Sequence, residues 1–328
     1  MKVIIPLAGK GTRLRPHTFS KPKPLVKVAG KAVLGHILDT LKGLPVEEIV
    51  FITGAMQEQI EQYVSSNYKY KASYIKQEEL LGDGYAIRMA KDIVDGDVLI
   101  VFVDTIFKAD LGVIHNLKDD GIVWVKQTKT PERFGVVIVD DNENITKIVE
   151  KPTTFVSDLA VIGLYYFKDS KKMFSYLDKI IEQKKTSSGG EYRLADAIEL
   201  MIEDGVKLKA YEVDVWADCG KPETLLSTNR YLLKHGHARI IDTENTVIIP
   251  PIHIGKGAKV ENSIIGPYVS IAEDCVIKNS IIRNSIIDTG STIENAALDS
   301  SLVGDNALVK DTFRKVNIGA NSEIDLSE

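Results

Sequence analysis

The sequence predicts an α/β protein whose Rossmann-like, mixed and mostly parallel sheet carries helices on both faces and is followed by a left-handed parallel β-helix. Three observations predict this fold class. Strand-length apolar runs alternate with helix-like segments from residue 1 to about residue 231. A basic, glycine-containing connection follows the first apolar run. From about residue 246 the helical spacing disappears, and isoleucine or valine recurs every five or six positions.

The apolar runs of the first region define the strands of the predicted sheet. Residues 2–8 (KVIIPLA) are short and mostly apolar, as expected for a buried strand, and a second run ends in Asp104. A hairpin is predicted where two β-rich segments flank a turn between Asp140 and Asn144. The predicted strands are residues 2–8, 46–54, 97–104, 136–140 and 145–150.

Two helices are predicted near the end of this region. Over residues 191–203, four apolar side chains fall on one face of a helix: Leu194, Ala197, Ile198 and Met201. Residues 222–238 are predicted to form a connecting helix, with Lys234 and His235 near its end. We therefore expect a first domain over residues 1–238, which ends in this helix, and a second domain over residues 239–328.

The second domain is predicted from short imperfect repeats. One inward aliphatic residue per side, with glycine, asparagine, serine or aspartate at the corners, is typical of a parallel β-helix, here of about three to four coils. The alternative, an antiparallel sandwich, would show longer strands with alternating polarity. We expect the β-helix to assemble copies of the chain into a homo-oligomer. The inward series is Ile254, Val260, Ile265, Ile271, Ile277, Ile282, Ile287, Ile293, Leu298, Val303 and Val309.

Composition bounds the function class. The net charge of -5 and the pI of about 5.8 argue against nucleic acid or an anionic membrane as a general partner, because phosphate-backbone binding usually needs a basic excess. Cys219 and Cys275 are isolated, which fits a reducing compartment better than a disulfide framework. No run has the length of a membrane span, and the first apolar run is too short for a signal peptide. The sequence predicts a cytoplasmic protein.

The connection after the first strand carries the strongest chemical signal. Residues 9–16 (GKGTRLRP) and 21–25 (KPKPL) combine two glycines, two arginines and three lysines at the carboxyl end of a strand, where open parallel sheets bind ligands. Gly9 and Gly11 can turn amide N–H groups toward an anion, while Arg13 and Lys23 add positive charge. A dinucleotide fingerprint would need a third glycine at Leu14, and a Walker A loop would need a Gly-Lys-Ser/Thr ending. The pattern predicts a triphosphate cradle.

These segments together resemble the nucleotide-binding signature of the sugar-1-phosphate nucleotidyltransferases, the glucose-1-phosphate thymidylyl- and uridylyltransferase-like enzymes that make nucleoside-diphosphate sugars. The resemblance implies that Gln77 reads the pyrimidine edge and that Gly82, in residues 82–86 (GDGYA), lets the base stack on backbone. It implies that residues 1–238 are the catalytic domain and that Arg13 and Lys23 are catalytic. The implied nucleotide-binding residues are Leu7, Ala8, Gly9, Gly11, Thr12, Arg13, Gln77 and Gly82.

Two aspartates are the predicted ligands of a Mg²⁺ cofactor. Displacement at the α-phosphorus by a sugar phosphate needs no protein nucleophile, because the attacking oxygen is already ionised; it needs charge neutralisation, in-line positioning and a metal held by carboxylates. Asp104 ends an apolar strand, so its carboxylate should emerge at the ligand edge of the sheet, although a turn-capping role is the simpler alternative. Asp218, in residues 216–223 (WADCGKPE), is similar to the family's second metal ligand.

The resemblance also assigns a sugar 1-phosphate site. Residues 134–137 (FGVV) and 148–152 (IVEKP) are similar to the family's hairpin, in which the glutamate binds sugar hydroxyls and the lysine reaches the phosphate. Residues 160–165 (AVIGLY) look like the segment whose glycine approaches the sugar ring. The implied residues are Gly135, Glu150, Lys151, which is also predicted to be catalytic, and Gly163.

The sequence departs from the family pattern at Val103, Asp83 and Leu7, where glycine, threonine or leucine, and alanine are more usual. The predicted activity is Mg²⁺-assisted transfer of a nucleotidyl group from dTTP or UTP to a sugar 1-phosphate, with glucose 1-phosphate favoured, releasing pyrophosphate. GDP-mannose or ADP-glucose synthesis stays open within the class. Two alternatives are a non-catalytic regulatory relative, and a bifunctional enzyme with an acetyltransferase in the β-helix, for which His253 is the only candidate base within the repeats.

Overall fold

The computed structural model describes residues 1–186 and 190–311. Its chain divides into two compact units, Met1–Thr228 and Asn229–Glu328. The division falls inside helix α6 (Pro222–Leu232), which continues as a short π-helical segment, Leu233–His237. Residues 312–328, which the sequence assigns to the second domain, lie outside the described residues.

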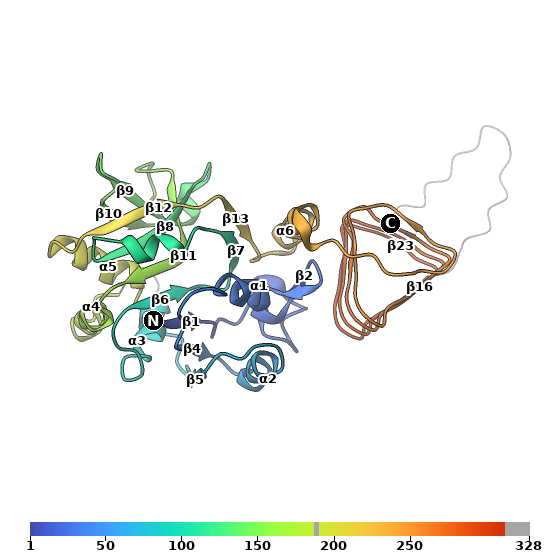
Figure 1. Ribbon diagram of the computed structural model, residues 1–328, viewed down its shortest axis with the longest axis horizontal. Helices are drawn as coiled ribbons and strands as arrows, with labels where there is room; N and C mark the ends of the chain where they lie inside the picture. Colours follow the sequence, from blue (N-terminus) through green and yellow to red (C-terminus); the bar gives the residue numbers. More distant parts are fainter. Residues whose placement is uncertain (187–189, 312–328) are drawn as a thin grey trace. The chain divides into compact units, whose positions relative to one another are not determined.

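The first unit is built on a mixed sheet in the order β10-β9-β11-β6-β1-β4-β5, with β8 paired to β11 and β12 to β8. Strands β6, β1, β4 and β5 are parallel neighbours, whereas the antiparallel pairs gather around β11 (Figure 1). The predicted fold class is confirmed. The strands are β1 (Lys2–Pro6), β4 (Glu48–Thr53), β5 (Ala72–Lys76), β6 (Val98–Val101), β8 (Gly121–Gln127), β9 (Gly135–Val139), β10 (Ile145–Glu150), β11 (Leu159–Phe167) and β12 (Leu208–Glu212).

Helices cover this sheet and bury its apolar residues. In α4, Met173, Leu177 and Ile180 face the core, and the Asp169 carboxylate caps the helix by accepting a hydrogen bond from the Lys172 amide at 3.1 Å. The helices are α1 (Val33–Thr40), α2 (Gln57–Asn67), α3 (Asp83–Arg88), α4 (Ser170–Glu182) and α5 (Leu194–Glu203). None of the helices in the described part of the chain is long and apolar enough to cross a membrane.

Shorter elements complete the first unit. An antiparallel pair joins β7 (Thr105–Lys108) to β13 (Val215–Asp218) and places Asp218 opposite Thr105. A second pair joins β2 (Lys27–Val28) to β3 (Lys31–Ala32). The 3₁₀ turns are η1 (Thr12–Leu14), η2 (Lys23–Leu25), η3 (Gly112–Asn116) and η4 (Pro131–Arg133).

The predicted helix over residues 191–203 begins three residues later, at Leu194. The preceding residues are held against another loop instead: the Tyr192 amide donates to the Leu81 carbonyl at 2.8 Å, and the Gly84 amide donates to the Tyr192 carbonyl at 2.9 Å. The helix end is capped from outside its own segment, because the Asp83 carboxylate accepts a hydrogen bond from the Leu194 amide at 2.7 Å. Local periodicity could not predict a cap that lies 111 residues away in the sequence.

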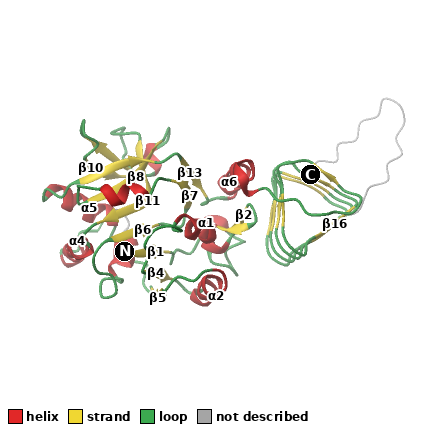
Figure 2. Ribbon diagram, viewed as in Figure 1, coloured by secondary structure: helices red, strands yellow, loops and turns green. Residues whose placement is uncertain are grey.

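The second unit is the predicted left-handed parallel β-helix. Three four-stranded parallel sheets form its sides, in the orders β14-β17-β20-β23, β15-β18-β21-β24 and β16-β19-β22-β25, and loops join their short strands (Figure 2). The strands are β14 (Val247–Ile248), β15 (His253–Ile254), β16 (Lys259–Glu261), β17 (Ile264–Ile265), β18 (Ser270–Ile271), β19 (Val276–Lys278), β20 (Ile281–Arg283), β21 (Ile286–Ile287), β22 (Thr292–Glu294), β23 (Ala297–Asp299), β24 (Leu302–Val303) and β25 (Leu308–Lys310).

The whole predicted aliphatic series lies in the core of this unit, as buried or partly buried side chains. Asparagines at the corners adopt positive φ and stack from coil to coil: the Asn245 amide donates to the Asn262 side chain at 2.8 Å, and that of Asn279 donates to Asn295 at 3.0 Å. The β-helix therefore buries one aliphatic column per side and satisfies its corners with side-chain amides.

Candidate functional site

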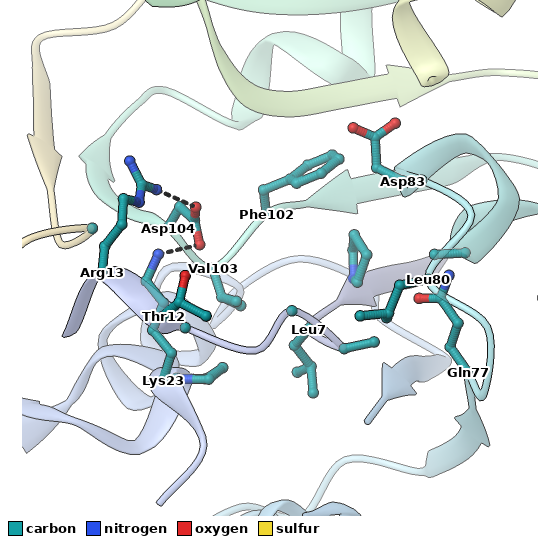
Figure 3. Close-up of a pocket in the computed structure, with 18 of the residues that line it drawn as sticks. Leu7, Thr12, Arg13, Lys23, Gln77, Leu80, Asp83, Phe102, Val103 and Asp104 are labelled. Carbon is teal, nitrogen blue, oxygen red and sulfur yellow. Dashed lines mark ion pairs between the residues drawn. The ribbon is translucent and has the colours of Figure 1, made fainter. Parts of the chain in front are cut away.

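A cavity of about 370 Å³ opens at the carboxyl ends of β1, β5 and β6, in the first unit. It is formed by the connection after β1, the loop between β5 and α3, and residues 102–104 after β6 (Figure 3). Parallel strands place these connections at one edge of the sheet, where open α/β sheets bind ligands. All eight residues predicted to bind nucleotide line this cavity, together with Lys23 and Asp104: Leu7, Ala8, Gly9, Gly11, Thr12, Arg13, Gln77 and Gly82.

The glycines of the predicted cradle play different parts. Gly11 adopts a left-handed φ of +61°, and a Cβ there would lie 3.0 Å from the Lys23 Cβ and 3.2 Å from the Thr18 Cγ2. Glycine is therefore required by both the turn and the close packing of the two basic segments. A Cβ at Gly9 would meet nothing within 4 Å, so the protein fold alone does not demand glycine there.

Asp104 lies between the two predicted cations. The Lys23 ammonium is 2.5 Å from its Oδ1, and the Arg13 guanidinium is 3.8 Å from its Oδ2 (Figure 3). The Lys23 side chain is only 10% exposed, whereas those of Arg13 and Asp104 are more than half exposed. This arrangement places one largely buried and one exposed positive charge, those of Lys23 and Arg13, beside a carboxylate at the mouth of the cavity.

Asp218 lies next to Asp104 along the β7–β13 pair. The Cys219 amide donates to the Asp104 carbonyl at 2.9 Å, and the Asp218 Oδ1 accepts a hydrogen bond from the Gly220 amide at 2.7 Å. Gly220 lines the cavity, and a Cβ there would lie 3.1 Å from an Arg13 nitrogen. The structure thus brings both predicted metal ligands to neighbouring backbone positions, although Asp218 is not among the residues that line the cavity.

The predicted sugar-site residues lie apart from the cavity wall but are connected to it. Gly135 and Glu150 are paired across the β9–β10 hairpin, and the Lys151 ammonium is 3.7 Å from the Glu150 carboxylate. Gly163 has a φ of +81° within a register shift of β11, and its carbonyl accepts a hydrogen bond from the Phe102 amide at 2.8 Å. Phe102 itself lines the cavity.

An acidic cluster, missed as a unit by the sequence reasoning, joins the hairpin to the cavity. Asp83 and Glu191 line the cavity, and Glu150 is ion-paired with Arg193, whose guanidinium is 2.9 Å from the Glu150 Oε1 and 3.4 Å from the Glu191 Oε2. Burial raises the pKa of Asp83 to about 6, and the negative charge of Glu150 acts in the same direction. In Figure 3, Asp83 lies at the opposite end of the pocket from Arg13 and Asp104.

Gly82 has a structural reason besides the predicted contact with a base. Its φ is +109°, and a Cβ would lie 2.3 Å from the Tyr192 carbonyl oxygen, so only glycine allows the segment before α5 to pack here. Val103, which departs from the family's glycine, is 4% exposed and lines the cavity beside Asp104. Further cavity residues, which the sequence analysis did not assign to a site individually, are Pro6, Pro24, Leu80, Ala86 and Phe102.

One buried donor near the hairpin has no partner. Among the described side-chain nitrogen and oxygen atoms that are buried, only the Trp216 Nε1 has no hydrogen-bond partner. The indole ring packs edge-on against Phe134 with centroids 4.6 Å apart, and the Phe134 carbonyl accepts a hydrogen bond from the Lys151 amide at 3.0 Å. A buried N–H group that lacks an acceptor costs free energy.

The family model for nucleotidyl transferases matches residues 2–235. The "Bifunctional protein GlmU" of Methanocaldococcus jannaschii is 40% identical over 264 residues, which are 79% of this chain and 61% of that protein. The "UTP--glucose-1-phosphate uridylyltransferase AglF" of Haloferax volcanii is 34% identical over 231 residues, 68% of this chain and 93% of that protein. This chain thus spans about three fifths of the GlmU relative.

The fold is also that of a solved structure, UDP-glucose pyrophosphorylase complexed with UDP-glucose. The superposition has a TM-score of 0.65 at 21% identity and covers 71% of this chain and 98% of that one.

Proposed function

This chain belongs to the nucleotidyl transferase family, and from that premise we propose that it transfers a nucleotidyl group from a nucleoside triphosphate to a sugar 1-phosphate and releases pyrophosphate. The observation that carries the proposal is the convergence of Arg13 and Lys23 on Asp104 at the mouth of a cavity lined by the glycine-containing loop. Clamping and neutralising two phosphate anions is the main task of such a site, because the attacking oxygen is already charged.

The residues present fit a Mg²⁺ ion. Mg²⁺ prefers hard oxygen ligands and is usually bound by one or two carboxylates together with substrate phosphates. Asp104 and Asp218 supply two carboxylates from neighbouring positions, one directly before β7 and one at the end of β13. Within the described residues, no group of three or more His, Cys, Asp or Glu side chains could hold a metal ion. Mg²⁺ bound here would neutralise charge on the phosphates.

Different residues of the chain are proposed to bind the two anionic substrates, the nucleoside triphosphate and the sugar 1-phosphate. We assign the triphosphate to the loop amides after Gly9, to Arg13 and to Lys23, whose ammonium would exchange Asp104 for phosphate oxygens. We assign the phosphate of the sugar to Lys151, which is 57% exposed at the end of the hairpin. Gln77 is almost completely buried on the cavity wall, where its amide can offer a donor and an acceptor to a pyrimidine base.

The favoured substrates are UTP or dTTP with glucose 1-phosphate. The uridylyltransferase relative supports this pairing, because its name specifies UTP and glucose 1-phosphate as substrates. This chain covers nearly all of its length. A pyrophosphate-release screen tests the proposal. Pure protein is incubated with Mg²⁺ and one nucleoside triphosphate at a time, either one of the four ribonucleoside triphosphates or dTTP. Each is assayed against a panel of sugar 1-phosphates. Release that requires both substrates is expected. Its absence with every pair would favour a regulatory, non-catalytic relative.

A second activity in the β-helix has one observation in its favour, the resemblance to a relative named as bifunctional. His253 is its candidate base. Its Nδ1 lies 3.2 Å from the His237 carbonyl oxygen, and burial lowers the pKa of its ring, which keeps the imidazole neutral. Turnover of acetyl-coenzyme A in the presence of sugar 1-phosphates tests this second function on the same protein.

Assembly through the β-helix is the proposed quaternary role. Outward-facing aliphatic side chains are exposed along the β14–β17–β20 side, where Val247 is 58%, Ile264 38% and Ile281 51% exposed. Sedimentation of the full chain and of Ile264→Lys/Ile281→Lys tests it. The double variant is expected to lower the oligomeric mass, because two added charges would have to be buried in the interface.

The reducing cytoplasm stays the predicted location. Cys219 and Cys275 are both buried, and neither forms a disulfide within the described residues.

A further inference from the structure

We propose that Arg193 is a positioning residue of the sugar subsite, whose guanidinium holds Glu150 so that one carboxylate oxygen is presented to the sugar hydroxyls. The inference rests on the proposed function and concerns a residue that the resemblance did not assign. It follows from the contacts of the two oxygens of Glu150, from the backbone that holds Arg193, and from the charges gathered around the pair.

The two oxygens of Glu150 have different surroundings. The Oε1 is 2.9 Å from an Arg193 nitrogen and 3.7 Å from the Lys151 ammonium. The Oε2 lies over Gly135, where a Cβ would be only 2.8 Å away. Arg193 therefore engages one oxygen and leaves the other above bare backbone, where a hydroxyl can reach it. An ionised carboxylate accepts hydrogen bonds only, so it suits the donors of a sugar ring.

The backbone around Arg193 is held in place by contacts other than the ion pair. The Tyr192 amide donates a hydrogen bond to Leu81, before α3, and its carbonyl accepts one from Gly84, in the first turn of α3. On the other side, the Leu194 amide donates to the Asp83 carboxylate at 2.7 Å. Gly84 has no side chain to separate the two segments, since a Cβ there would lie 2.8 Å from the Arg193 carbonyl carbon. A side chain on such a fixed segment can orient its partner accurately.

The charges require a cation at this point. Three carboxylates gather here, those of Asp83, Glu150 and Glu191, and Arg193 is the group that contacts two of them. Its side chain is 12% exposed and that of Glu150 is 27% exposed, so solvent screens their interaction only in part. Without the guanidinium, like charges would push Glu150 away from its partners. Arg193 thus sets the position of the acid that is proposed to face the sugar.

The test compares Arg193→Gln and Arg193→Lys with the matched control Arg88→Gln. Arg88 makes a similar pair, with its Nε 2.8 Å from Asp178, but on α3 and outside the cavity lining. With UTP and glucose 1-phosphate, Arg193→Gln is expected to raise the KM for glucose 1-phosphate about tenfold and to change the KM for UTP less than about twofold. Arg193→Lys should recover part of the loss, and Arg88→Gln should match wild type.

Deoxy sugars separate positioning from a general structural effect. Glucose 1-phosphates that lack the 2-, 3- or 4-hydroxyl are assayed with wild type, Arg193→Gln, Glu150→Gln and the double variant. Loss of the hydroxyl that Glu150 contacts should lower kcat/KM strongly in wild type and much less in Arg193→Gln. The double variant should be no worse than Glu150→Gln, since both changes remove the same interaction. Equal losses for every sugar, or additive losses in the double variant, would overturn the inference.

The titration of Asp83 supplies an independent readout. The charged and titratable groups that face Asp83 are Glu150 on β10, Glu191 and Arg193 before α5, and Tyr165 on β11. Of these, only the positive charge of Arg193 lowers the pKa of Asp83, so removal of Arg193 should raise that pKa, which NMR titration of the Asp83 carboxyl in wild type and Arg193→Gln measures. If wild type is inactive with every substrate pair, the proposed function fails. If wild type is active and Arg193→Gln behaves like Arg88→Gln, only this inference fails.

Discussion

The two units of this chain differ in how regularly their side chains pack and in where they carry charge. The β-helix repeats one packing rule, and its inward positions, such as Ile271, Ile277 and Ile282, are completely buried. The first unit repeats nothing, and at the edge of its sheet it gathers charged side chains from separate connections, such as Lys23 and Asp104. The difference indicates where the chain places stability and where it places chemistry. The core of the β-helix is aliphatic, and polar side chains buried beside it, such as Ser285 and Ser291, are hydrogen-bonded to backbone carbonyls, whereas a reactive site requires charges held close together.

The largest expected effect separates chemistry from folding in the first unit. Asp104→Asn or Asp218→Asn should lower kcat about 100-fold or more, because either change removes a carboxylate proposed to neutralise charge at the phosphates. Steady-state pyrophosphate release measures the loss, and thermal unfolding checks that the fold survives. Asp299→Asn in the β-helix weakens an exposed ion pair with Arg283 and keeps an oxygen that can accept the hydrogen bond from the Ser300 hydroxyl, so it is the control and should keep full activity. Near-normal turnover of Asp104→Asn at saturating Mg²⁺ would contradict the metal assignment.

The next largest effect distinguishes the residues that bind the nucleoside triphosphate from those that bind the sugar 1-phosphate. Arg13→Ala should raise the KM for the nucleoside triphosphate about tenfold or more, whereas Lys151→Ala should act mainly on the KM for the sugar 1-phosphate. Lys147→Ala is the control, since Lys147 is an exposed residue of the same strand as the hairpin acid. Initial-rate measurements with each substrate varied in turn decide the matter. Equal changes in both KM values for both variants would show that the proposed division is wrong.

The fold was more predictable from sequence than the site. The aliphatic period reveals the β-helix because each repeat makes the same contact, and the apolar run before Asp104 reveals a central strand. The cavity residues of the connection after β1 also follow from sequence, since they lie together in one motif. The pairing of Glu150 with Arg193 could not be predicted, because it depends on how the segment before α5 packs against Gly82.

A third prediction concerns stability alone. Ile277→Ala should lower the free energy of unfolding of the β-helix by about 2–5 kcal/mol, because it leaves a cavity in a fully buried column. Lys278→Ala on the same strand points outward, loses an exposed ion pair with Glu261, and should change stability by less than about 0.5 kcal/mol. Denaturant unfolding gives both values. Pyrophosphate release under native conditions should be unchanged in each variant, and a parallel loss of activity would break the separation between the units.

The last effect tests whether the ionised carboxylate of Asp83, in the candidate site, lowers the free energy of unfolding. Burial raises the pKa of Asp83 from 3.8 to about 6, so between these values the folded protein holds a proton that the unfolded chain has released. Stability should therefore fall as pH rises from about 4 to about 6 and stay lower above it. Asp83→Asn can keep the hydrogen bond from the Leu194 amide and should be more stable than wild type at pH 7.5, by about 1–3 kcal/mol.

Asp178 provides the control of opposite sign. Burial acts to raise the pKa of its carboxyl, but hydrogen bonds from Lys91 and Arg88 outweigh it, and the pKa is lowered. Its contribution to stability is present above the ordinary value of 3.8 and is lost as pH falls through the lowered pKa. Asp178→Asn should therefore destabilise the protein at pH 7.5, where Asp83→Asn stabilises it. Unfolding free energies at pH 5 and pH 7.5 measure both, and a destabilised Asp83→Asn at pH 7.5 would mean that the carboxylate near Arg193 supports the fold and is not a cost of the site.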